Sequence, residues 1–228
     1  QTCALPILRR ADGRYVFYFV AGSQIGAAVA DTPYGPFVPE AEPIVRKGTF
    51  DCHTIDPGVY VEDDGTRYFL WGNQRAWVAP FSDDCLSFDE QEAFSWVPGD
   101  FREAIWIHKR NGIYYASWSE NDARDPEYCV KYAMSDSLHG PWSEPRTLVE
   151  QDPAHKLYGT GHHNIVNIPG TDEWIIAYHR FAYNPAGRWS GGDGCHRETV
   201  FAPLNHNADG TLEPVRPQTG SYIRPLNF

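Results

Sequence analysis

The sequence predicts an all-β protein made of short strands joined by tight turns. Aromatic residues make up 14% of the 228 residues, and the chain has 20 Gly and 18 Pro but a single Met. Aromatic side chains favour strands, while Gly and Pro favour the turns between strands. No segment shows the 3.6-residue apolar period of an amphipathic helix. Together these observations argue against a helical bundle.

Four similar hairpin units repeat along the chain. In each unit a glycine-containing turn such as Asp-Gly or Asn-Gly, which supplies positive φ angles, is followed by an aromatic strand. The aromatic strands begin at Tyr15, Tyr68, Tyr114 and Trp174, with spacings of 53, 46 and 60 residues. Antiparallel units that recur about every 50 residues are typical of β-propeller blades. We therefore expect residues 1–228 to form a single β-propeller domain, either a four-bladed ring or part of a larger one.

The strands follow one another in the same order in each unit. The expected strands are 14–19 and 26–30, then 58–61 and 66–71, then 105–107, 113–118 and 130–134, and finally 174–179. A second turn, Gly-Pro followed by an aromatic residue, recurs at 35–37 and 140–142. A β-sandwich could use the same hairpins, but it gives no reason to repeat so specific a turn. The repeated turn favours a propeller.

The first seven residues differ from the rest of the chain. The sequence starts at Gln1 without an initiator Met, and residues 1–7 resemble a translated sequencing adapter. We expect these residues to be non-native and the first blade to be incomplete. The compartment therefore stays undecided between secreted and cytoplasmic.

Charge and cysteine content exclude several classes of function. The net charge of −11 disfavours nucleic acid and anionic membranes as partners, because both require clustered Lys and Arg. No apolar stretch approaches 18 residues, so no membrane span is expected. The five cysteines are odd in number and form no CxxC pair, which argues against a disulfide framework or a zinc ribbon. We expect buried free thiols.

Two carboxylates lie where strands begin, the edge at which the blades of a propeller converge. Asp56 comes just before Pro57, which restricts the backbone; the alternative is an ordinary turn aspartate. Glu103 lies among aromatic and aliphatic residues, where desolvation should raise its pKa, as a general acid requires. The alternative for Glu103 is an ion pair with Arg102.

Two further candidates lie at the beginning of later strands. His162 and His163 are adjacent, so on a strand they point to opposite faces and should not bind one zinc ion together. Either of them could face a central channel. Arg197 follows a glycine-rich loop and could hold sugar hydroxyls or orient a carboxylate; the alternative is a surface pair with Glu198.

The segment around Glu103 carries a family resemblance. Glu103-Ala104, followed by 106–112 and Tyr114-Tyr115, closely resembles the proton-donor segment of glycoside hydrolase family 43. Residues 55–57 resemble the segment of the aspartate that tunes the acid's pKa. Residues 159–166, 178–179 and Arg197 match the pattern of the last blade, and the resemblance runs from about residue 12 to about 215.

The resemblance implies a five-bladed propeller, with four blades visible and the first incomplete, that hydrolyses arabinofuranosides or xylosides of hemicellulose by inversion. It implies that Glu103 is the proton donor and that Asp56 modulates its pKa. Arg197, Trp71 and Trp106 would bind the carbohydrate, although blade core is the alternative for both tryptophans. No cofactor is required. His162 could line a central channel and contact a structural calcium ion there through an intervening water molecule. We expect Asp56, Glu103, His162 and Arg197 to converge on one face of that channel.

One expected residue has no counterpart. The family's general base is an aspartate near the start of the first blade, but Asp12 belongs to a hairpin turn and Asp31 to a Gly-Pro-Phe turn. We assign no general base in this chain and expect the fragment to be nearly inactive. Two alternatives stay open: a non-catalytic carbohydrate-binding propeller, and an invertase-like retaining glycosidase.

Overall fold

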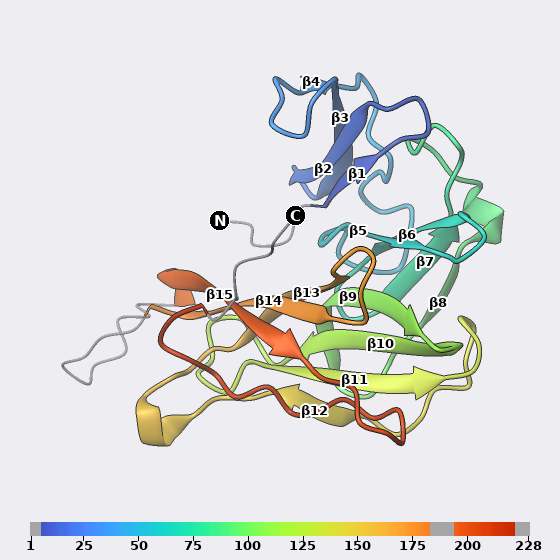
Figure 1. Ribbon diagram of the computed structural model, residues 1–228. Coiled ribbons are helices and arrows are strands. Elements are labelled where there is room, and N and C mark those ends of the chain that lie inside the picture. Colours follow the sequence, from blue (N-terminus) through green and yellow to red (C-terminus); the bar gives the residue numbers. More distant parts are fainter. Residues whose placement is uncertain (1–5, 183–193, 222–228) are drawn as a thin grey trace. The chain divides into compact units, whose positions relative to one another are not determined.

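The structure, a computed structural model, describes residues 6–182 and 194–221. These residues form four antiparallel sheets, and in each sheet the strands are neighbours in chain order (Figure 1). Helix in the described part of the chain is limited to short 3-10 segments such as Glu90–Glu92 and Pro153–His155. Nowhere in that part is a helix long and apolar enough to cross a membrane. The predicted all-β class is confirmed.

The chain divides into two compact units, Thr2–Ile107 and His108–Phe228. The prediction of a single domain over 1–228 therefore stays a prediction. The first unit contains the sheets β1–β4 and β5–β8, and β9 leads from it into the second unit, which contains β10–β12 and the sheet β13–β15. The strands are β1 (Ile7–Arg9), β2 (Tyr15–Ala21), β3 (Gln24–Ala30), β4 (Val38–Pro39), β5 (Gly58–Val61), β6 (Arg67–Trp71), β7 (Ala76–Pro80), β8 (Phe94–Trp96), β9 (Phe101–Arg110), β10 (Ile113–Glu120), β11 (Cys129–Ser135), β12 (Arg146–Val149), β13 (Gly161–Asn167), β14 (Trp174–Phe181) and β15 (Arg197–Leu204).

The predicted hairpin turns have the expected backbone geometry. Gly13 and Gly65 both have φ of 88°, and the pair Asn111-Gly112 has φ of 52° and 80°. The aspartate before each of the first two glycines accepts a hydrogen bond from the backbone two residues ahead, as Asp12 does from Arg14 at 3.0 Å. Local turn chemistry thus determines where each aromatic strand begins.

The core of the first unit is an aromatic cluster between its two sheets. Tyr18 of β2 packs on Phe69 of β6, with ring centroids 5.3 Å apart, and its hydroxyl donates to the Cys85 carbonyl at 2.9 Å. Burial raises the pKa of Tyr18. Of the expected buried thiols, Cys85 and Cys129 are buried, Cys52 is half-buried and Cys195 is exposed, while Cys3 lies outside the described residues.

The second unit packs around buried aromatic residues on β10, β11 and β14, including Trp118, Tyr132 and Tyr178. Tyr132 accepts a hydrogen bond from the backbone of Leu212 at 3.0 Å, and the backbone of Val215 donates to the Leu148 carbonyl at 2.7 Å. The segment after β15 is thereby tied to the sheet that ends in β12.

We expect Gly161→Ala to lower the free energy of unfolding by about 1–3 kcal/mol, the usual cost of overpacking a core. A Cβ atom at this position would lie 2.1 Å from Cε1 of Tyr128, whose side chain is fully buried. Urea unfolding measures the change. Gly220→Ala is the matched control, because a Cβ there meets nothing within 4 Å. Equal stability of the two variants would show that β13 can move away from Tyr128.

Candidate active site

The structure places the two predicted carboxylates side by side in the first unit. Asp56 lies two residues before β5 and Glu103 lies near the start of β9. Their closest carboxylate oxygens are within 4.8 Å of each other, and both side chains are half-buried. The backbone N–H of Ala104 donates to Oδ2 of Asp56 at 3.0 Å, so the residue after Glu103 holds the neighbouring carboxylate in place.

Three residues with left-handed backbone mark the candidate positions. Asp56, Ala104 and His162 have φ of 57°, 59° and 48°. Each lies at or near the start of the first strand of its sheet, namely β5, β9 and β13. The pairing of β13 with β14 also shifts register between Gly161 and Asn164, as at a β-bulge. Left-handed non-glycine residues are costly and cluster at functional sites, which supports a functional role for the strand starts in each unit.

Asn73 is a site residue that the sequence analysis missed. It follows β6, is 5% exposed, and donates from Nδ2 to Oε2 of Glu103 at 3.0 Å. Its neighbours Gly72 and Gln74 donate from the backbone to the carbonyls of Ile55 and Arg102, at 2.9 and 2.8 Å. A Gly-Asn pair after a buried strand is the only sequence signal for this turn, and it does not indicate a partner.

In the second unit, the two adjacent histidines have different surroundings. His163 is 1% exposed and its Nε2 lies 2.6 Å from Oγ of Ser117, whereas His162 is half-buried. The backbone N–H of His162 donates to Oγ of Ser119 at 2.8 Å, and its ring lies 6.2 Å from that of His179. The expectation that His162 and His163 do not share one ion stays a prediction.

Arg197 opens β15 and is half-buried, and its Nε donates to the carbonyl of Gly194. Glu198, which the sequence offers as an alternative partner for Arg197, pairs with the buried Arg180 at 2.7 Å. Asp56 and Glu103 lie in one unit and His162 and Arg197 in the other. The convergence of all four on one face therefore stays a prediction.

The two tryptophans proposed for carbohydrate binding differ in exposure. Trp71 is fully buried and stacks on Trp77 and Phe69, with ring centroids 6.1 and 5.7 Å apart. This packing lies within the core of the first unit, so it favours the alternative role of Trp71 as blade core. Trp106 on β9 is half-buried and keeps part of its ring accessible.

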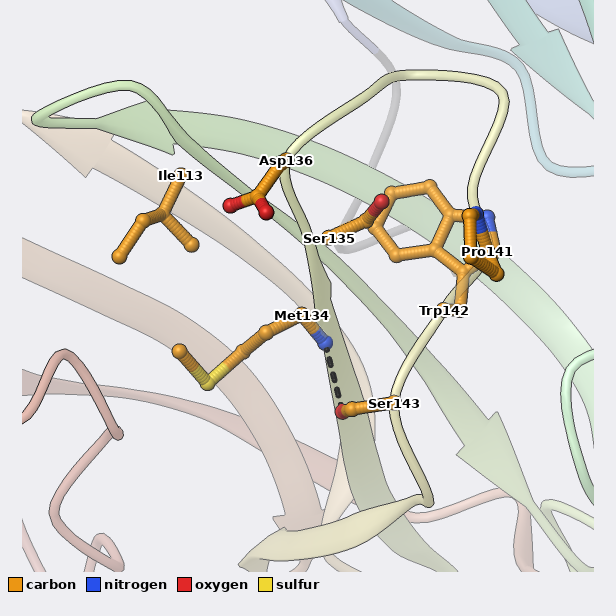
Figure 2. Close-up of a pocket in the computed structure, with 7 residues that line it drawn as sticks. All are labelled: Ile113, Met134, Ser135, Asp136, Pro141, Trp142 and Ser143. Carbon is orange, nitrogen blue, oxygen red and sulfur yellow. Dashed lines mark hydrogen bonds between the residues drawn. The ribbon is translucent and has the colours of Figure 1, made fainter.

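The described surface carries two small pockets near turns. One, of about 400 Å³, lies at the Gly-Pro-Trp turn of the second unit (Figure 2), where the Met134 backbone donates to Oγ of Ser143 at 3.0 Å. None of the predicted site residues lines it. The other, of about 360 Å³, lies in the first unit and is lined by Phe50, Asp51, Cys52, His53, Gln74 and Arg75. The second pocket therefore borders the turn that contains Asn73.

The donor chemistry in the second unit limits what ion His162 could bind directly. Calcium prefers oxygen ligands, whereas His162 and the nearby His179 offer ring nitrogens. Burial holds the pKa of His179 well below its ordinary value, so this imidazole is neutral. These residues do not fit direct calcium coordination, and they fit calcium only through intervening water.

Comparison with known proteins identifies relatives along most of the chain. The sequence profile of glycosyl hydrolases family 43 matches residues 5–212. The chain is 30% identical to a β-xylosidase of Xylanibacter ruminicola, over 90% of this chain and 72% of the relative. It is also 30% identical to a xylosidase/arabinosidase of Bacteroides ovatus, over 88% of this chain and 69% of that protein.

A solved structure is similar to this one. It is the calcium-free form of a β-xylosidase/α-arabinofuranosidase from a compost microbial metagenome, in complex with xylotriose. It has a TM-score of 0.72 and 31% sequence identity, and the match covers 96% of this chain and 73% of that chain.

Proposed function

This chain belongs to glycoside hydrolase family 43, and we propose that it cleaves xylosyl or arabinofuranosyl linkages by inversion, with Glu103 as the proton donor. The family fold is a five-bladed β-propeller, and four blade-like sheets lie among the described residues, so the predicted fold class is confirmed. As a member of this family, the protein is a glycosidase.

The short distance between Asp56 and Glu103 is the observation that supports the proposed roles of proton donor and modulating carboxylate. Inverting glycosidases need about 6.5–9.5 Å between acid and base, to leave room for the attacking water. The closest oxygens of Asp56 and Glu103 lie within 4.8 Å, which is too near for an acid and base on opposite faces of a sugar. We therefore propose Asp56 as the modulating carboxylate beside the proton donor, not as the base.

The proposed reaction requires three events at the anomeric carbon. Glu103 gives its proton to the leaving oxygen, the glycosidic bond breaks, and a water molecule attacks from the opposite face of the ring and releases a proton to the solvent. Arg197 and Trp106 are the proposed contacts for the sugar. The substrates are xylo-oligosaccharides, such as the xylotriose bound to the similar structure, or arabinofuranosyl side chains. A structural calcium, if bound near His162, would be held through water and is not required for these steps.

No residue of this chain is assigned as the base, so we expect slow hydrolysis in water. Azide is a nucleophile that needs no base, and it should attack aryl xylosides or arabinofuranosides to give a glycosyl azide of inverted configuration. Product analysis by NMR tests the proposal. Fast hydrolysis without azide would reveal a base in the chain, and retained configuration would indicate a covalent intermediate. Binding of xylotriose without any product would indicate a non-catalytic propeller.

We expect Asp56→Asn to move the alkaline limb of the pH profile of kcat/KM to lower pH. The amide oxygen can still accept from the Ala104 backbone, so the local geometry is kept while the negative charge is lost. The measurement is azide-dependent release of aryl alcohol between pH 5 and pH 9. Asp51→Asn is the matched control, because this exposed carboxylate lies at a pocket rim. A limb that stays in place would remove Asp56 from the proposed role.

A further inference from the structure

A single turn connects the backbone segments of both carboxylates in the first unit. Gly72 donates to the carbonyl of Ile55, the residue before Asp56, and Gln74 donates to the carbonyl of Arg102, the residue before Glu103. Asn73 lies between these two anchors, and its backbone also pairs with His53 in an antiparallel bridge. The position of Asn73 is therefore set by the strand starts that carry the carboxylates.

We propose that Asn73 is a positioning residue that fixes the Glu103 carboxyl with its acidic proton on Oε1. The inference rests on the proposed role of Glu103 as proton donor. Its basis is the hydrogen bond from Nδ2 of Asn73 to Oε2 of Glu103, 3.0 Å long, together with the 5% exposure of Asn73.

The chemistry of the two groups determines which oxygen carries the proton. A side-chain amide nitrogen only donates hydrogen bonds, so Oε2 must accept. In a protonated carboxyl group one oxygen bears the proton and donates, and the other keeps its acceptor capacity. Because the carbonyl oxygen is the stronger acceptor of the two, the amide at Oε2 favours the proton on Oε1. When Glu103 has released that proton, the same amide donates to a carboxylate, which is a stronger bond.

The turn is built to hold Asn73 in this place. Gly72 has φ of 120°, and a Cβ atom there would lie 2.1 Å from the carbonyl oxygen of Arg75. Gln74 has φ of 65°, a left-handed conformation. The left-handed conformation of Gln74 is costly for a residue with a side chain, and such strain persists where the surroundings require it, while position 72 admits only glycine.

The first test compares leaving groups. We expect Asn73→Ala and the isosteric Asn73→Asp to lower azide-dependent kcat by about 10–100-fold on aryl glycosides with poor leaving groups. Substrates with strongly acidic leaving groups, which need little protonation, should lose at most about threefold. Gln74→Asn, which tolerates the left-handed backbone, is the control and should stay within about twofold of wild type. An equal loss on all substrates would reduce Asn73 to a structural residue and overturn the proposal.

A second test does not depend on activity. Isotope-edited infrared spectra of protein labelled at the glutamate carboxyl carbon, taken as a difference against Glu103→Gln, report the C=O stretch of protonated Glu103. We expect this stretch at lower wavenumber in wild type than in Asn73→Asp or Asn73→Ala, because only the wild-type carbonyl accepts from the amide. Identical stretches would overturn the assignment. Absence of glycosidase activity in wild type would instead contradict the proposed function, and the infrared result would still decide the role of Asn73.

Discussion

Glu103→Gln should lower kcat/KM on glycosides with poor leaving groups by about 10²–10⁴-fold, the usual contribution of general acid catalysis. Glutamine keeps the shape of the side chain and can retain an acceptor for the Nδ2 group of Asn73, but it has no proton to deliver. A strongly acidic leaving group departs without protonation. The kcat/KM of aryl glycosides that carry such a group should therefore fall much less. The slope of log kcat/KM against leaving-group acidity therefore steepens in the variant.

The measurement uses a series of aryl xylosides and arabinofuranosides with azide present, so that the missing base does not limit the rate. Glu120→Gln, which changes a half-buried glutamate at the end of β10 in the other unit, is the control and should leave the slope unchanged. An unchanged rate in Glu103→Gln would remove the proton-donor role from this residue. A uniform loss across the series would indicate a folding defect, which near-UV circular dichroism can detect.

Much of the fold follows from short-range chemistry. The Asp-Gly and Asn-Gly turns adopt positive φ wherever they occur, so the strands that follow them begin where expected, as β2 does at Tyr15. The strand predicted at 105–107 instead runs over Phe101–Arg110. The left-handed Ala104 interrupts the alternation of side chains within β9, which hides the start of the strand from a pattern of period two.

The candidate site was only partly predictable, because some of its contacts join segments that are distant in the sequence. Asp56 and Glu103 occupy equivalent strand starts, so the repeat itself indicates that they lie close together. Asn73 follows the strand after Asp56, and its contact with Glu103 depends on how segments about 30 residues apart pair, which no local motif encodes. Trp71 could pack on a sugar or in the core by composition alone, and only its burial distinguishes these roles.

The free energy of unfolding should fall steeply as the pH drops below about 6.5, because the second unit buries neutral histidines. Burial lowers the pKa of His163 to about 3 and that of His206 to about 4. The pKa values of His108 and His179 also lie well below the ordinary value, again chiefly because of burial. The ring nitrogens Nε2 of His108 and His206 lie 3.3 Å apart, so a charge on one disfavours a charge on the other.

The direction of the effect follows from proton uptake. Unfolded imidazoles bind protons near pH 6.5, whereas folded His163 binds none until about pH 3, so the unfolded chain takes up more protons in this window. Stability is complete above pH 6.5 and is lost as the pH falls through the window. At pH 4.5, His163 alone should cost roughly 3 kcal/mol, from two pH units at about 1.4 kcal/mol each. The exposed Asp172, whose pKa the Arg110 guanidinium lowers to about 2, contributes only at more acidic pH.

Urea unfolding at pH 7.5 and pH 4.5 measures the loss, and His163→Gln isolates one imidazole. Glutamine can keep a hydrogen bond to Ser117 but does not titrate, so the difference in free energy between the two pH values should shrink by about 2–3 kcal/mol. His139→Gln, which replaces an exposed histidine, is the matched control and should leave the difference unchanged. The same pH dependence in wild type and His163→Gln would mean that His163 takes up its proton equally in the folded and unfolded chains. The acid sensitivity would then have to come from the other buried histidines, His108, His179 and His206, or from carboxylates.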